Sequence, residues 1–380
     1  MLRTASILLR TTSAQGKSLA ALRAAYAEAC NRLVPTVIEH RCWNRVAMHN
    51  LAYSGLRAQT ALGSQMACNA IFSVCKAYKA QKALGRIKQH EPVPQLRFDR
   101  ASVHYDKRTY SLKGDALSLY TLAGRITVTM KLGEHQRRIF KSGEAKEAEL
   151  VFRNGNWFFN LVVESDDPQA VASGPVMGVD VGENTLAATS TGKVFGGEAL
   201  RQRRDAHLAL RRRLQSNGSQ SARQALQQVS GKERRRVKHI NHETSKAIVA
   251  EAVRHGVARI AMEDLTHIRA RIRAGRRMRG RLHRWAFRQL QSFVEYKARA
   301  LGIEVIYLDP AYSSQSCSGC GGLGKRVKHR FVCGECGLRA HADLNASRNL
   351  ARIGGTAVLP RAAVSTPDVG KLGRAIHVLQ

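Results

Sequence analysis

The sequence predicts a multidomain α+β protein: a β-barrel or sandwich with an inserted helical segment, followed by an α/β domain that carries a small metal-binding ribbon. Three observations support this prediction. The 380 residues exceed the usual size of one hydrophobic core. The spacing of the apolar residues changes twice along the chain, and four cysteines near its end form two closely spaced pairs.

The first part of the chain combines a short strand with helices. Residues 1–16 contain arginine, serine and threonine but no acid, as organellar transit peptides do, yet the apolar pattern favours a strand from Ser6 to Leu9. Apolar residues then recur every three or four positions up to a pair of prolines. We therefore expect a helical segment over residues 17–95.

The apolar residues next recur at every second position. Arg125 to Lys131 alternates in this way, and two further apolar runs flank Asn154-Gly155, a pair suited to the positive φ angles of a type I′ turn. A hairpin is expected there. The strand at the start of the chain should complete this sheet, so that residues 1–16 and 96–170 form one β-domain around the helical insertion.

Continuous apolar runs and long polar helices then indicate an α/β domain over residues 171–312 and 341–353. The expected strands are Val176 to Val181, a second one through Ala187, and Val257 to Met262. The expected helices are residues 199–215, 222–254, about 280–300, and one that begins near Ala342. Residues 354–380 lack a periodic pattern, and we expect them to be disordered or loosely packed.

The net charge indicates a polyanionic partner. The chain has 62 Lys and Arg against 28 Asp and Glu, which gives a formal charge of +34 and a pI near 10.7. The excess is spread along the whole chain, so nucleic acid is favoured over an acidic membrane surface. No run of 18 apolar residues occurs, so no membrane span is predicted. We expect a soluble, cytoplasmic, nucleoid-associated prokaryotic protein.

Clustered basic residues are the candidate contacts to nucleic acid. They lie in the two long predicted helices and between the cysteine pairs, where a phosphate-lined groove and a solvated surface are both open interpretations. The candidates are Arg203, Arg204, Arg211, Arg212, Arg234, Arg235, Lys325 and Arg326.

Three acidic residues are candidate ligands of catalytic metal ions. Asp180 interrupts an apolar strand, where an isolated carboxylate is costly unless it is paired or bound to a cation. Glu263 ends another short apolar strand, and Asp343 starts a helix. Each acid also has an ordinary structural interpretation, as an ion-pair partner or a helix cap. Together they suit two Mg²⁺ ions that promote phosphodiester hydrolysis.

The four paired cysteines predict a zinc ribbon. Cys317 and Cys320 form one C-x-x-C pair, and Cys333 and Cys336 form the second after twelve intervening residues. This spacing is typical of two knuckles that together bind one tetrahedral zinc ion. No position is left open for water, so the zinc of the ribbon, residues 313–340, should be structural.

Four short segments of the sequence, which include the three acids and flank the cysteines, together resemble one family. This family is the TnpB-type transposon-encoded RNA-guided nucleases, relatives of the type V CRISPR effectors. The segments are GVDVG at 178–182, AMEDL at 261–265, DPAYSSQ at 309–315 and ADLNA at 342–346, in the order of the family. Residues 280–300 also resemble the helix before the third motif. His341 stands where many relatives carry asparagine.

The resemblance implies a RuvC-like nuclease domain of RNase H fold, preceded by an oligonucleotide-binding-like wedge barrel around a helical recognition lobe. It implies that Asp180, Glu263 and Asp343 bind two catalytic Mg²⁺ ions and that the four cysteines bind one Zn²⁺. It further implies a guide RNA from the transposon end and double-stranded target DNA, cut beside a short adjacent motif to leave 5′-phosphate and 3′-hydroxyl ends.

Three other functions remain open at this point. A nuclease-silent RNA-guided repressor would typically have lost one or more of the three acids, and all three are present. A type V CRISPR effector would differ in genomic context and not in chemistry. An unguided transposase or recombinase would need a different arrangement of acids, and the sequence contains no sign of one.

Overall fold

The first strand of the chain lies in the middle of its sheet. In the computed structural model, β1 (Leu2–Arg10) pairs with β7 on one side and β5 on the other, in a near-closed, seven-stranded antiparallel barrel ordered β2-β6-β7-β1-β5-β4-β3. The expected strand at Ser6–Leu9 is therefore confirmed. The other strands are β2 (Val103–Tyr105), β3 (Tyr110–Lys113), β4 (Ala116–Thr121), β5 (Gly124–Lys131), β6 (Glu144–Arg153) and β7 (Asn156–Glu164).

The structure describes residues 1–99, 101–182, 185–265, 287–309 and 315–356, without the side chains of Ala199, Arg201 and Arg204. Two compact units divide the chain between Asp166 and Asp167. Within these described ranges, no helix is long and apolar enough to cross a membrane.

The hairpin predicted at Asn154-Gly155 is present. β6 and β7 pair up to Arg153 and Asn156, and the two turn residues have φ angles of 51° and 75°. Both values are positive, as a type I′ turn requires. The two-residue turn at Asn154-Gly155 therefore sets the register of β6 against β7.

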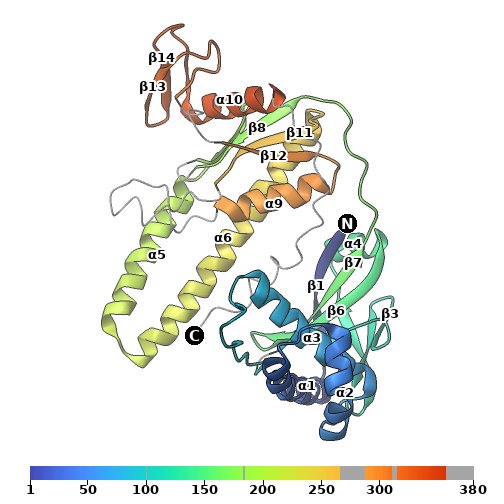
Figure 1. Cartoon of the computed structure of the whole chain (residues 1–380). Coiled ribbons are helices and arrows are strands. Elements are labelled where there is room, and N and C mark those ends of the chain that lie inside the picture. The colour runs from blue at the N-terminus through green and yellow to red at the C-terminus, as the bar shows by residue number, and fades with distance from the viewer. Residues whose placement is uncertain (100, 183–184, 266–286, 310–314, 357–380) are drawn as a thin grey trace. The chain divides into compact units, whose positions relative to one another are not determined.

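Three helices, all labelled in Figure 1, follow β1 in the sequence and precede β2: α1 (Ser13–His40), α2 (Arg45–Gln59) and α3 (Ser64–Ala83). α1 begins at a capping box, in which the side chains of Thr12 and Gln15 each accept a hydrogen bond from the other residue's backbone N–H. The helices share one core with the barrel, where Tyr26 and Tyr78 are buried in the same cluster as Phe159. A short helix, α4 (Glu134–Lys141), follows β5.

The second unit is built on a five-stranded mixed sheet ordered β10-β9-β8-β11-β12. β8, β11 and β12 are parallel, whereas β9 and β10 are antiparallel to their neighbours. The strands are β8 (Val176–Asp180), β9 (Thr185–Thr189), β10 (Val194–Gly196), β11 (Arg259–Glu263) and β12 (Glu304–Leu308). The expected strands of the α/β domain are present, each within about two residues of its predicted position.

Helices cover both faces of this sheet. Met177, Val179 and Met262 point to one face and share a core with α6 (Gln220–Arg254) and α9 (Phe287–Arg299). The alternate residues Gly178 and Ala261 face α10 (Ala342–Thr356). Bulky side chains on one face and small ones on the other explain why α10 packs so closely on the sheet.

The long polar helices predicted after the first three strands are confirmed as α5 (Glu198–Asn217) and α6. Gly218 lies between them with a φ of 69°, and Gly256 has a φ of 60° just beyond the end of α6. α10 begins at Ala342 as expected and continues to Thr356, three residues into the segment predicted to be disordered. Residues 357–380 of that prediction lie outside the described residues.

The ribbon is a three-stranded antiparallel sheet of β13 (Gly324–Val327), β14 (Arg330–Cys333) and β15 (Arg339–His341). β15 runs directly into α10. The side-chain amides of Asn345 and Asn349 on α10 both donate to the backbone oxygen of Ser316, and Ser318 N–H donates to Asn345. The ribbon and the start of α10 are therefore bound to each other.

Candidate metal centres

Two of the three predicted carboxylates lie side by side at one edge of the sheet. β8 ends at Asp180 and β11 ends at Glu263, and the parallel register pairs Val179 with Met262 one residue earlier. The side-chain amide of Gln291, buried on α9, donates to the backbone oxygen of Glu263 at 2.6 Å and fixes the end of that strand.

Asp343 reaches the same edge because α10 lies directly against β8. A Cβ placed on Gly178 would come within 1.8 Å of the Ser347 backbone oxygen and 2.6 Å of the Ala351 nitrogen. Ser347 lies one helical turn after Asp343, which is buried in the first turn of α10. The glycine of the GVDVG segment therefore allows the close approach that brings Asp343 to the end of β8.

We predict that Gly178→Ala disrupts this edge of the sheet. The new methyl group meets helix backbone, so α10 must move, at a cost of about 1–3 kcal/mol or more in unfolding free energy. A shift of about 1 Å in Asp343 would lower a metal-dependent reaction roughly 100-fold. Chemical denaturation and a nuclease assay measure the two effects.

Gly196→Ala is the matched control for that variant. Gly196 ends β10 in the same sheet, and nothing lies within 4 Å of a Cβ placed there. Equal behaviour of the two variants would contradict the role of close packing at Gly178.

The negative charges of Glu263 and Asp343 act on the pKa of Asp180. Burial, followed by the negative charges of Glu263 and Asp343, raises the pKa of Asp180 from 3.8 to about 8, whereas Arg326 lowers it. Three carboxylates gathered in this way repel one another, and a bound cation would offset that repulsion. Hard divalent cations such as Mg²⁺ prefer such oxygen ligands, so the donor set fits the predicted metal ions.

The raised pKa predicts a pH-dependent stability. A carboxyl that binds its proton more tightly in the folded chain makes the fold less stable as the pH rises from about 4 toward 8. In Mg²⁺-free buffer, Asp180→Asn should therefore gain melting temperature relative to the native chain at pH 8 but not at pH 4. Thermal melts from pH 4 to 8 test this, and a constant difference would contradict it.

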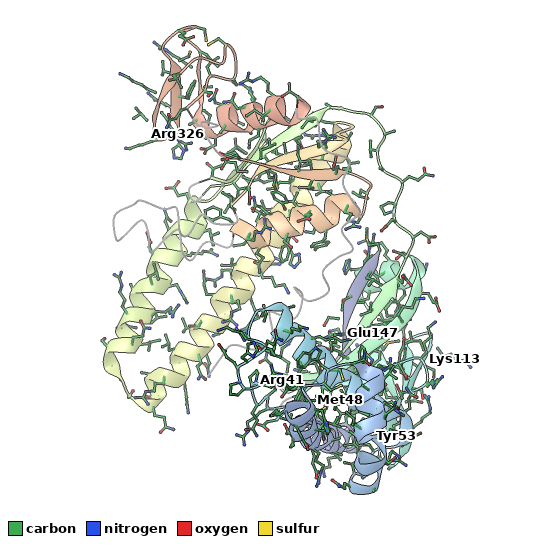
Figure 2. The ribbon with its side chains drawn as sticks, viewed as in Figure 1. Arg41, Met48, Tyr53, Lys113, Glu147 and Arg326 are labelled. Atoms are coloured by element: carbon green, nitrogen blue, oxygen red, sulfur yellow. The ribbon has the colours of Figure 1, made fainter. Side chains whose placement is uncertain are left out.

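Arg326 on β13 also belongs to this site. Arg326 is labelled in Figure 2. Its Nη2 donates to Asp343 Oδ1 on α10 at 2.6 Å. Lys325 beside it is exposed. The sequence offered Lys325 and Arg326 equally as contacts to nucleic acid, whereas the structure places Arg326 against Asp343.

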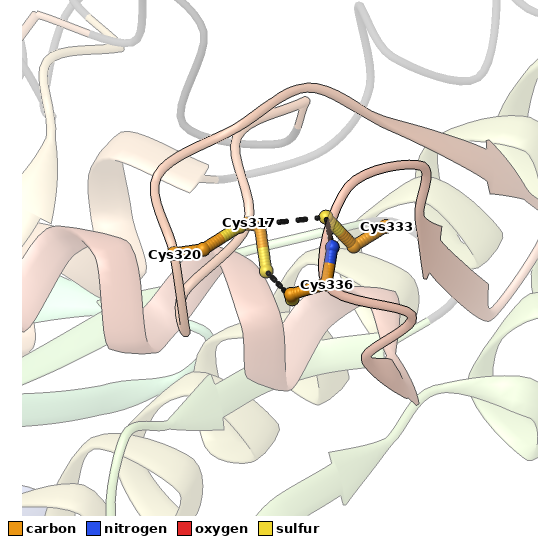
Figure 3. A group of neighbouring side chains, drawn as sticks. All are labelled: Cys317, Cys320, Cys333 and Cys336. Atoms are coloured by element: carbon orange, nitrogen blue, oxygen red, sulfur yellow. Dashed lines mark hydrogen bonds between the residues drawn. The ribbon is translucent and has the colours of Figure 1, made fainter.

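The four ribbon cysteines are gathered as zinc binding requires (Figure 3). Sγ of Cys317 lies 3.6 Å from that of Cys336, and Sγ of Cys320 lies 3.5 Å from that of Cys333. Zinc–sulfur bonds of about 2.3 Å in a tetrahedron separate the sulfurs by roughly 3.8 Å. Backbone N–H groups of Cys336 and Glu335 lower the pKa of Cys333 to about 7, which favours the thiolate that binds metal.

The predicted arginines of α5 and α6 lie on those two helices. Arg203, Arg212, Arg234 and Arg235 are exposed and Arg211 is half-buried, whereas the side chain of Arg204 lies outside the described residues. Residues 310–314 of the DPAYSSQ segment also lie outside them. The contacts of these arginines with nucleic acid stay predictions.

Sequence reasoning missed two residues that shape the site. Gly178 was part of a recognised segment, but its packing role depends on α10, which is distant in sequence. Gln291 could have been recognised from the sequence, because it is a polar residue on the apolar helix face formed by Phe287, Leu290 and Val294. A buried polar side chain on such a face needs a partner, and here that partner is the backbone of Glu263.

Known proteins share this fold. The solved structure of a Cas12f1 complex with single-guide RNA and target DNA aligns with 89% of this chain and 83% of its own, at a TM-score of 0.60 and 15% identity. CasPhi-2 (Cas12j) bound to crRNA aligns with 95% of this chain and 99% of its own, at a TM-score of 0.52 and 11% identity. The chain therefore has the multidomain α+β fold of Cas12-type proteins.

Sequence comparisons specify the relationship. An OrfB_IS605 family model, described as a probable transposase, matches residues 160–269, and the TNB domain model of Cas12f1-like proteins matches residues 287–350. A TnpB-like protein of Methanocaldococcus jannaschii is 28% identical over 63% of this chain and 91% of its own. Over these residues the chain is similar to TnpB-like and Cas12f1-like proteins.

Two further relatives are similar over less of their length. The CRISPR-associated endodeoxyribonuclease Cas12f1 of Sulfoacidibacillus thermotolerans is 45% identical over 29% of this chain, which spans 26% of that protein. A putative RNA-guided DNA endonuclease of Streptomyces pristinaespiralis is 26% identical over 67% of this chain and 63% of its own.

Proposed function

We propose that the protein is an RNA-guided DNA endonuclease of transposon origin, with Asp180, Glu263 and Asp343 as its catalytic residues. The observation that carries this proposal is the meeting of three carboxylates at one sheet edge, where burial and the charges of Glu263 and Asp343 raise the pKa of Asp180. The TnpB-like and Cas12f relatives support the same activity.

The three acids would hold two Mg²⁺ ions. When bound, these ions supply a Lewis acid that activates water and stabilises the leaving oxygen of a phosphodiester. The strand ends hold Asp180 and Glu263 rigidly, and α10 brings the third carboxylate to them. Arg326 adds a guanidinium beside Asp343, where it can donate to a phosphate oxygen.

The partners we propose are a guide RNA from the transposon end and double-stranded target DNA. The Cas12f1 structure contains a single-guide RNA and target DNA, and the CasPhi-2 structure contains a crRNA. A charge of +34 also suits a long path of phosphate contacts. In such complexes base pairing supplies the sequence specificity, while the protein binds phosphates and reads only a short adjacent motif.

We assign the domains accordingly. Residues 1–16 and 96–170 would form the wedge barrel and residues 17–95 the recognition lobe. Residues 171–312 and 341–353 would form the nuclease domain, and residues 313–340 the zinc ribbon.

The alternative function of a nuclease-silent repressor lacks support, because all three acids are retained and lie together. No observation favours an unguided recombinase over a guided nuclease.

Expression of the chain with its flanking genomic DNA tests the proposed function. The purified protein should contain a discrete RNA that ends in transposon-flanking sequence. Reprogrammed to a plasmid target, that complex should cut DNA when Mg²⁺ is added. Absence of a discrete RNA, or cutting that ignores the guide sequence, would refute guidance, and a repeat array beside the gene would assign the chain to a CRISPR system.

Arg326→Ala should lower the rate of cleavage far more than the affinity for DNA. A single donor that stabilises charge in a transition state contributes roughly 100-fold or more to the rate. Lys325→Ala is the matched control, because it removes the same charge from the adjacent, exposed position. Single-turnover cleavage and filter binding measure the two quantities; equal slowing by both substitutions would argue for a general charge effect.

A further inference from the structure

A second group of metal-binding side chains lies beside the carboxylates. His329, His341 and Asp343 each offer one ligand atom, and these atoms lie within 4.8 Å of one another. His329 lies in the turn between β13 and β14, His341 ends β15, and Asp343 lies in the first turn of α10. Three different elements therefore converge on one point.

The backbone holds the two histidines in place. Lys328 has a φ of 53° in the turn, and the Ala342 N–H donates to the His329 oxygen at 2.8 Å. Their rings are stacked, with centroids 5.4 Å apart and planes inclined by 24°. The hairpin tip is thus bound to the start of α10 at the point where the imidazoles meet.

One atom of this group lacks a partner within the described part of the chain. Nδ1 of His341 is buried and makes no hydrogen bond there, and it lies 4.0 Å from Asp343 Oδ2. Arg326 contacts the other carboxylate oxygen, Oδ1. A buried nitrogen without a partner is unfavourable, and a cation between it and Oδ2 would satisfy both atoms.

We propose that His329, His341 and Asp343 form a further metal site, selective for transition-metal ions such as Zn²⁺, Co²⁺ or Ni²⁺. Imidazole suits these ions, whereas Mg²⁺ prefers oxygen ligands alone. Bonds of about 2 Å in a tetrahedron separate ligand atoms by roughly 3.3 Å, so the present separations need to close by about 1.5 Å at most. The side chain of His329 is exposed, so rotation about its side-chain bonds can close this distance while the backbone stays in place.

Occupancy of this site has a consequence that rests on the proposed nuclease function. Asp343 belongs to both sites, so a transition-metal ion bound by the two histidines withdraws that carboxylate from the Mg²⁺ centre. The ion would therefore inhibit DNA cleavage. The binding itself does not depend on the nuclease proposal.

Co²⁺ titration of the nucleic-acid-free full chain, with Zn²⁺ in the ribbon, tests the site. Co²⁺ bound to imidazole and carboxylate gives visible d–d bands without the charge-transfer bands of cysteine ligands. We expect one additional Co²⁺ per chain in the native protein and at least a tenfold weaker affinity in His329→Gln and His341→Gln. His40→Gln, an exposed histidine in the first unit, is the control.

If His341→Gln fails to fold, His329→Gln still tests the site, because His329 is exposed and its replacement should not affect folding. Absence of the bands in the native protein, or native affinity in His329→Gln, would overturn the site. Co²⁺ should also inhibit Mg²⁺-dependent cleavage by the native complex and not by His329→Gln. Binding without inhibition would overturn the sharing of Asp343, whereas no cleavage under any condition would count against the proposed function alone.

Discussion

Replacing Asp180 with asparagine is expected to abolish DNA cleavage while guided DNA binding is retained. The substitution keeps the shape of the side chain but removes a charged metal ligand. Metal ions supply several kcal/mol of transition-state stabilisation, and about 1.4 kcal/mol corresponds to a tenfold change, so the rate should fall roughly 1,000-fold or more. Cleavage kinetics and mobility-shift titrations of the guide-loaded protein measure the two properties.

Glu304→Gln is the matched control for this substitution. Glu304 begins β12 in the same sheet and forms an ion pair with Arg259 away from the three acids. Its loss should leave cleavage nearly unchanged, since exposed ion pairs contribute about 1 kcal/mol or less. If Asp180→Asn weakened DNA binding as much as cleavage, Asp180 would have a structural role and not a catalytic one.

Cys317→Ser should release the zinc and unfold the ribbon. Structural zinc sites contribute about 10–16 kcal/mol of apparent binding free energy in small zinc domains, so three remaining ligands cannot maintain the fold. Cleavage should fall as well, because β15 leads into α10 and the ribbon carries Arg326 to Asp343. Zinc content by atomic absorption, thermal melts and the nuclease assay report these effects.

Cys42→Ser provides the control for thiol removal. Cys42 is half-buried in the first unit and lies outside the ribbon. The variant should retain zinc, melting temperature and activity. A Cys317→Ser protein that retained all three properties would show that the four cysteines do not form a structural zinc site.

The features of the site that the sequence could predict are local ones. An acid at the end of an apolar strand is costly to bury unless it has a partner, and this cost identifies both Asp180 and Glu263 as candidate site residues. Cysteine spacing and the Asn154-Gly155 turn follow from short-range geometry as well. Each of these signals lies within about twenty residues, where bond lengths and φ angles limit the alternatives.

The features that could not be predicted depend on packing between distant segments. Arg326 meets Asp343 because the ribbon is bound to α10 through Asn345 and Asn349, and no periodic pattern encodes that contact. The His329–His341 pair depends on the register of β14 with β15. Helix α4 is only eight residues long and lies between strands, so it gave no clear helical pattern.

The central position of β1 has a consequence for synthesis of the chain. The ribosome releases β1 long before its two neighbours, since Leu8 pairs with Lys131 and Phe158. During that interval α1, α2 and α3 can form from contacts nearby in sequence, whereas β1 exposes both of its unpaired edges. We expect this strand to be the part of the nascent protein that most needs a chaperone, because long-range pairing is slow and open strand edges aggregate.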